Sequence, residues 1–74
     1  MSWNVVLRSE LEVVVLAEDL PDERLTKGMI GTVVNVFEVP TLAYLVEFCD
    51  EEGRTIALPT LLPVQLNDYA TDLP

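Results

Sequence analysis

The chain has 74 residues, and its 13 acidic against 4 basic side chains give a formal net charge of −9. It holds one cysteine and no histidine, which excludes an intrachain disulfide, the usual Ser-His-Asp and Cys-His nucleophilic sites, and imidazole metal ligands. The acidic excess over scattered basic residues also argues against nucleic acid and anionic membrane surfaces as partners. A chain of this length builds one small domain.

The first predicted strand is the valine-rich run 11–16, which is too short and too β-branched to favour a helix. An acidic loop follows it, and the proline of that loop favours extended backbone geometry at Leu20. We expect Leu20 and Leu25 to hold the loop against the core. Residues 1–10 are predicted to form an N-terminal segment that packs on the domain.

Two glycines precede the clearest strand of the chain. Gly28 can supply the positive φ of a turn, and Gly31 suits a bulge or a close backbone approach. The run 32–37 is predicted as a strand, and the run 42–49 as a second long one. Alternation along the second strand predicts one inward face, formed by Tyr44, Val46 and Phe48.

The segment 50–53 has the residues of a hairpin turn. Asp50 can accept hydrogen bonds from the turn backbone, and Gly53 can adopt the left-handed conformation of a bulged loop. The partner strand is predicted over residues 54–58. Pro59 is expected to end its regular pairing, because proline has no N–H to donate.

The last part of the chain predicts one short helical turn at residues 61–64, a final strand at 65–67 and a frayed tail at 68–74. Five short strands without an amphipathic helix indicate an all-β domain over residues 11–67. Because closure hides strand edges, the fold expected is a small five-stranded, partly open SH3-like barrel with one short helical turn before the last strand.

Several of these segments match a known family in the same order: Val13–Leu16, Glu18–Pro21, Gly28, Gly31–Val34, Tyr44–Phe48, Asp50–Gly53 and Leu66. On these residues, which span about three quarters of the chain, the sequence resembles a small bacterial family, the domain-of-unknown-function family numbered four-nine-two-six. The resemblance implies an SH3-like barrel in a bacterial cytoplasm. It implies no activity, no cofactor and no catalytic residue.

The residues themselves offer few reactive groups. The first loop carries four carboxylates that could coordinate a hard cation, Glu18, Asp19, Asp22 and Glu23. Their spacing is not that of an EF-hand, so a solvated loop is the favoured interpretation. Cys49 lies among carboxylates, which disfavours its thiolate, and Arg54 is expected to pair with them across the hairpin. We therefore predict no catalytic, cofactor-binding or metal-binding residue, and no enzymatic activity.

The mean hydropathy of +0.33 is high for so small a domain, and surplus apolar surface commonly marks an interface. The candidate partner interface consists of Trp3, Val39, Pro40, Leu42, Leu61 and Leu62.

We predict a non-enzymatic acidic protein-interaction module whose partner is a basic protein. Its size and charge suit a protein that neutralises or modulates the product of a neighbouring gene. The unpaired thiol, together with the absence of a signal-peptide pattern or a long apolar segment, favours the cytoplasm. Two alternatives stay open: a homo-oligomeric structural protein, and an RNA- or ribosome-associated SH3-like module.

Overall fold

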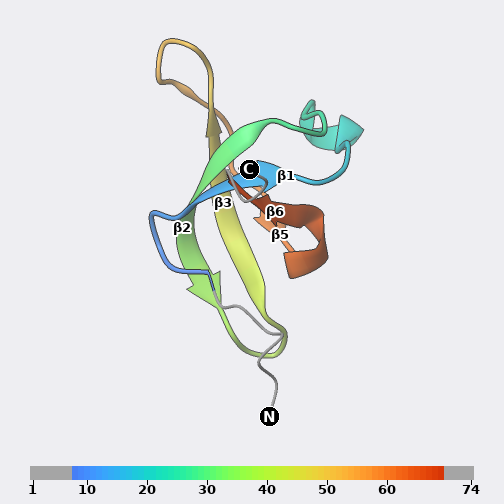
Figure 1. The fold of residues 1–74 in the computed structure, drawn as a ribbon, viewed down its shortest axis with the longest axis vertical. Helices are drawn as coiled ribbons and strands as arrows, with labels where there is room; N and C mark the ends of the chain where they lie inside the picture. Colours follow the sequence, from blue (N-terminus) through green and yellow to red (C-terminus); the bar gives the residue numbers. More distant parts are fainter. Residues whose placement is uncertain (1–7, 70–74) are drawn as a thin grey trace, which may run out of the picture.

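The computed structural model describes residues 8–69, and within them the chain is all-β apart from two short 3₁₀ turns (Figure 1). The 3₁₀ turns are η1 (Pro21–Glu23) and η2 (Pro63–Gln65). The strands of this described part are β1 (Val13–Leu16), β2 (Ile30–Phe37), β3 (Ala43–Cys49), β4 (Thr55–Ala57), β5 (Thr60–Leu61) and β6 (Leu66–Asp68).

All strand pairs are antiparallel, and the strands form one sheet in the order β4-β3-β2-β1-β6, with β5 also paired to β3. The sheet curls into a small, partly open barrel, and η2 leads directly into the last strand (Figure 1). The predicted all-β class, the open barrel and the helical turn before the last strand are confirmed. The likeness to SH3 domains stays a prediction.

The structure has six strands in its described residues where the sequence predicts five, and Pro59 is the reason. From Ala57 onward, the chain lies along β3 in one register, since Phe48 pairs with Ala57 and Tyr44 with Leu61. The register shifts at the start of β4, between Phe48 and Cys49. Pro59 interrupts this line because it has no N–H to donate to β3. Its carbonyl still accepts the Val46 N–H at 3.0 Å. The expected end of regular pairing near Pro59 is borne out, since β4 stops at Ala57, but the sequence did not predict that pairing with β3 resumes in β5.

The core lies on the concave side of the curled sheet. Tyr44, Val46 and Phe48 are fully buried, which confirms the face predicted from alternation. Every strand but β4 contributes to the buried cluster, and β4 packs its Ala57 against it. The cluster consists of Val14, Leu16, Leu25, Val33, Tyr44, Val46, Phe48, Leu61 and Leu66.

Gly31 pairs with Val14 of β1 and lies beneath the buried side chains of β3. A Cβ atom on this residue would lie 2.7 Å from Cγ1 of Val46, 2.9 Å from Cε1 of Phe48 and 3.1 Å from the carbonyl oxygen of Glu47. The predicted close approach is therefore confirmed, and a side chain at this position would force its neighbours to move. Gly28 has a φ of 95°, as its predicted turn requires.

Much of the two predicted terminal segments falls on residues 1–7 and 70–74, which lie outside the described residues. Arg8 is described, and its main-chain N–H donates to the hydroxyl of Tyr44 at 3.2 Å. Its guanidinium bonds the carboxylate of Glu12 at 2.8 Å and that of Asp68. Burial lowers the pKa of Arg8, but the hydrogen bonds to Asp68 and Glu12 outweigh it and hold the pKa above its ordinary value. Asp68 belongs to β6, so the last strand extends one residue beyond its predicted end.

Candidate protein-binding groove

The loop between β1 and β2 is fixed to the barrel by two leucines. Leu20 and Leu25 exchange backbone hydrogen bonds of 2.9 and 3.1 Å, and the Leu25 side chain is only 1 % exposed. Between them, Arg24 caps η1 in the left-handed conformation, with a φ of 61°, and its N–H donates to the carbonyl of Pro21 at 3.0 Å. The predicted role of these leucines is confirmed, and it gives η1 a fixed place beside β5.

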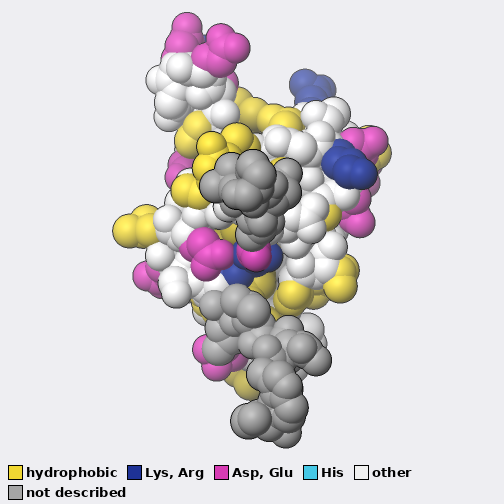
Figure 2. Space-filling model, viewed as in Figure 1, with side chains coloured by type: hydrophobic (Ala, Val, Ile, Leu, Met, Phe, Trp, Pro, Cys, Tyr) yellow, Lys and Arg dark blue, Asp and Glu magenta, His cyan; other side chains and the backbone are white. Residues whose placement is uncertain are grey.

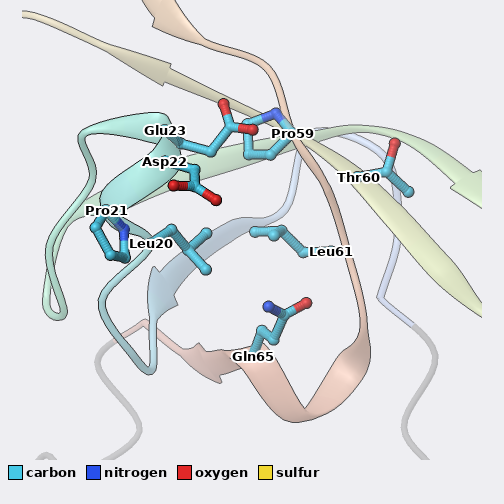
Figure 3. A pocket seen from close by; sticks show the side chains of 8 residues that line it. All are labelled: Leu20, Pro21, Asp22, Glu23, Pro59, Thr60, Leu61 and Gln65. Carbon is cyan, nitrogen blue, oxygen red and sulfur yellow. The ribbon is translucent and has the colours of Figure 1, made fainter.

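A groove of about 300 Å³ lies between η1 and β5. Its apolar floor includes Leu20 and Leu61, whose side chains point toward one another across the groove (Figure 3). Glu23 of η1 and Pro59 both line this groove (Figure 3). The lining residues are Leu20, Pro21, Asp22, Glu23, Pro59, Thr60, Leu61 and Gln65.

The rim of the groove is negatively charged. Asp22 and Glu23 are exposed, and within residues 8–69 neither carboxylate has a hydrogen-bond or ion-pair partner. Gln65 closes one side of the groove, and its Nε2 donates to Oε2 of Glu18 at 3.0 Å. Figure 2 shows acidic and basic side chains together over the loop that carries η1, but the charged residues that line the groove are acidic. The groove therefore combines an apolar floor with two free carboxylates.

The structure does not bring the sequence-predicted interface residues together. Val39 is 84 % exposed and lies beside Pro40 in the connection between β2 and β3. This connection lies at the bottom of Figure 1, far from the loop that carries η1. Leu42 is half-buried and packs against the core. Leu62 is 46 % exposed before η2. Trp3 lies outside the described residues.

The structure buries Leu61, which the sequence predicts to be part of the surplus apolar surface. Its side chain is 3 % exposed and belongs to the core cluster, because β5 pairs with β3 and turns it inward. Leu61 therefore forms the floor of the groove and is not part of an exposed patch.

Sequence reasoning missed an apolar strip on the outer face of β1 and β2. Val13 and Ile30 are exposed there, and Ile30 pairs with the half-buried Val15. The signal was present in the sequence, because three consecutive valines place apolar side chains on both faces of a strand.

The second acidic cluster has a structural role in the β3–β4 turn. The carboxylate of Asp50 accepts the backbone N–H groups of Arg54 and Glu52, both at 2.9 Å, and the Nε of Arg54 lies 3.0 Å from its Oδ2. The bond from the Arg54 backbone, with those from Glu52 and the guanidinium, lowers the pKa of Asp50. Arg54 also pairs with Glu52. These contacts confirm the predicted turn chemistry and the cross-strand ion pair.

Other chemistry is sparse in the described part of the chain. Cys49 is a free, exposed thiol. Residues 8–69 contain no group of three or more acidic or cysteine side chains arranged to hold a metal ion, and no helix among them is long and apolar enough to cross a membrane. Within the described residues, the groove between η1 and β5 is the hollow that combines apolar side chains with free carboxylates, and we consider it as the candidate site.

Comparison with known proteins places the chain in a family without assigning it an activity. No curated protein and no solved structure matches the sequence. The family described as Domain of unknown function (DUF4926) matches residues 10–68, which is most of the chain and all of the strands described above. The match and the resemblance found in the sequence agree: the chain belongs to the DUF4926 family.

Proposed function

We propose that the chain is a non-enzymatic module that binds a basic segment of a protein partner in the groove between η1 and β5. One observation carries this proposal: the apolar floor formed by Leu20 and Leu61 lies directly beside the free carboxylates of Asp22 and Glu23. A partner segment that carries one apolar side chain and one cationic side chain would contact both the apolar floor and the carboxylates.

The charge of the whole molecule supports the same partner. A net charge of −9 attracts basic proteins over several ångströms and raises the rate of encounter, an effect that salt weakens. The same field repels phosphate backbones and anionic lipids. Of the macromolecules that a bacterial cytoplasm offers, a basic protein is therefore the one that the surface favours.

The proposed cellular role follows from size and charge. The protein would act in the bacterial cytoplasm by covering a basic surface of its partner, and so neutralise or modulate the product of a neighbouring gene. A small acidic domain suits this task because it needs only a surface that competes with the partner's other ligands.

The test begins with recovery of the partner by native pull-down at natural abundance, followed by measurement of its affinity. The informative variant is Asp22→Asn with Glu23→Gln, which removes two negative charges from the groove. Its matched control is Glu38→Gln with Glu51→Gln, which removes two charges from exposed positions outside the groove.

We expect the groove variant to weaken binding about tenfold at low salt, equivalent to about 1.4 kcal/mol. The control should change the affinity much less, because distant exposed charges are screened. Equal affinities for the two variants would show that the partner binds elsewhere. Recovery of the protein alone at natural abundance would also count against the proposal.

A further inference from the structure

We propose that the partner segment binds in an extended conformation, as an added β-strand on the outer edge of residues 58–60. This inference rests on the proposed function and states how the groove would recognise its ligand. The edge borders the groove, since Pro59, Thr60 and Leu61 all line it.

The direction of the backbone groups along this edge follows from one hydrogen bond. The N–H of Val46 in β3 donates to the carbonyl of Pro59 at 3.0 Å, so the polar backbone groups of Pro59 face β3. Because these groups alternate in direction along a strand, those of Leu58 and Thr60 face away from β3. In the described part of the chain no strand lies on that side and no hydrogen bond from another segment reaches them.

Pro59 leaves this outer edge intact. A proline usually prevents strand pairing because it lacks an N–H, but here the missing donor is on the side of β3. The outer side keeps the amides of both Leu58 and Thr60. Leu58 is 50 % exposed and Thr60 is exposed. An unpaired edge of this kind is a template for another strand.

Charge selects a basic segment over a second copy of the chain. Asp22 and Glu23 line the other side of the groove and have no partner within the described residues. A second copy would bring another net charge of −9 and a further pair of free carboxylates to the same place. An extended segment with lysine or arginine at alternate positions would instead place its cations on the side of η1, while its backbone pairs with the edge.

The proposal can be tested by amide hydrogen exchange in the full-length, isotope-labelled protein. The probe is an acetylated and amidated pentapeptide in which lysine and valine alternate, titrated to millimolar concentration. In the complex, we expect exchange to slow about tenfold or more at the amides of Leu58 and Thr60, since each gains a hydrogen bond. The acidic pentapeptide with glutamate in place of lysine serves as the charge control and should not bind.

A pair of variants isolates the backbone contribution. Thr60→Pro removes the outward N–H but no bond to β3, whereas Thr60→Ala removes only the side chain. The peptide should bind the first variant about tenfold more weakly and the second with unchanged affinity. Spectra of the free variants show whether each keeps the fold. If Thr60→Pro does not fold, the exchange measurement on the unmodified protein decides the question.

The outcomes are distinct. Slowed exchange at Leu58 and Thr60 with weaker binding by Thr60→Pro supports strand addition. Chemical-shift changes around the groove without slowed exchange at these two amides overturn strand addition. The proposed function would still stand, because it is judged separately by the binding of the natural partner to the Asp22 and Glu23 variant. Absence of any chemical-shift change also overturns strand addition. Strand addition is also overturned if exchange at these amides is already slow without peptide and becomes faster when the protein is diluted. Such a result would assign the edge to a second copy of the chain.

Discussion

Replacement of Gly31 by alanine tests the packing of the barrel most directly. The new Cβ would lie 2.7 Å from Cγ1 of Val46 and 2.9 Å from Cε1 of Phe48, and both side chains are fully buried. Neither is the end of a flexible chain, so relief requires movement of the β2–β3 pair. Overpacking of this kind lowers the free energy of unfolding by about 1–3 kcal/mol. Alanine restricts the unfolded backbone more than glycine does, which raises the free energy of unfolding by about 0.5–1 kcal/mol.

We therefore expect Gly31→Ala to lower the free energy of unfolding by about 1–2 kcal/mol and the melting temperature by about 5–15 °C for a domain of this size. The measurement is urea and thermal unfolding followed by circular dichroism. A domain of this length has a total stability of about 4–11 kcal/mol, so the change should be easy to resolve.

A double-mutant cycle with Val46→Ala separates the clash from other causes. Val46→Ala removes the methyl group that the new Cβ would meet, so the double variant should be more stable than the sum of the single effects by about 0.5–2 kcal/mol. Strict additivity, or a stability of Gly31→Ala within about 0.5 kcal/mol of the unmodified protein, would refute the reasoning.

Three further predictions concern other parts of the barrel. Leu25→Ala should lower the free energy of unfolding by about 2–4 kcal/mol because the Leu25 side chain is buried. The control Leu62→Ala should lower it by less than about 1 kcal/mol. Similar losses for the two variants in urea titrations would contradict the role assigned to Leu25. Arg8→Ala should cost about 1 kcal/mol through loss of its bonds to Glu12 and Asp68, and the loss should shrink in 1 M salt; a loss independent of salt would count against ion pairing. Asp50 has a pKa lowered on folding, so its contribution to stability is present above its ordinary pKa and is lost as the pH falls through the folded-state value. Asp50→Asn should therefore reduce the melting temperature at neutral pH but not below the folded-state pKa, and an equal reduction at both would refute the assignment.

The functional proposal separates the two acidic clusters, which look alike in the sequence. The carboxylate of Asp50 is engaged by the turn backbone and by Arg54, so it already has a structural role. Asp22 and Glu23 have no such engagement in the described residues and stand beside an apolar floor. Because these two carboxylates are free and those of the other cluster are engaged, the proposal places the partner on the η1 side.

Local sequence signals predicted the strands and turns well. Alternation identified the buried face of β3, since side chains two residues apart point the same way in any strand. The roles of Gly28, Gly53 and Asp50 also follow from chemistry within a few residues, because positive φ values and turn hydrogen bonds depend on local conformation. These features required no knowledge of distant segments.

Tertiary structure alone decided where the groove between η1 and β5 lies and which apolar residues line it. The groove joins η1 to β5 and Gln65. These segments meet because η1 lies in the loop between the paired strands β1 and β2, while β5 pairs with β3 in the same sheet. The same long-range pairing buries Leu61, which the sequence placed on the surface, and turns the free amides of Leu58 and Thr60 outward. Hydropathy shows that a residue is apolar, but the pairing of distant strands determines whether it faces the core, a groove or solvent.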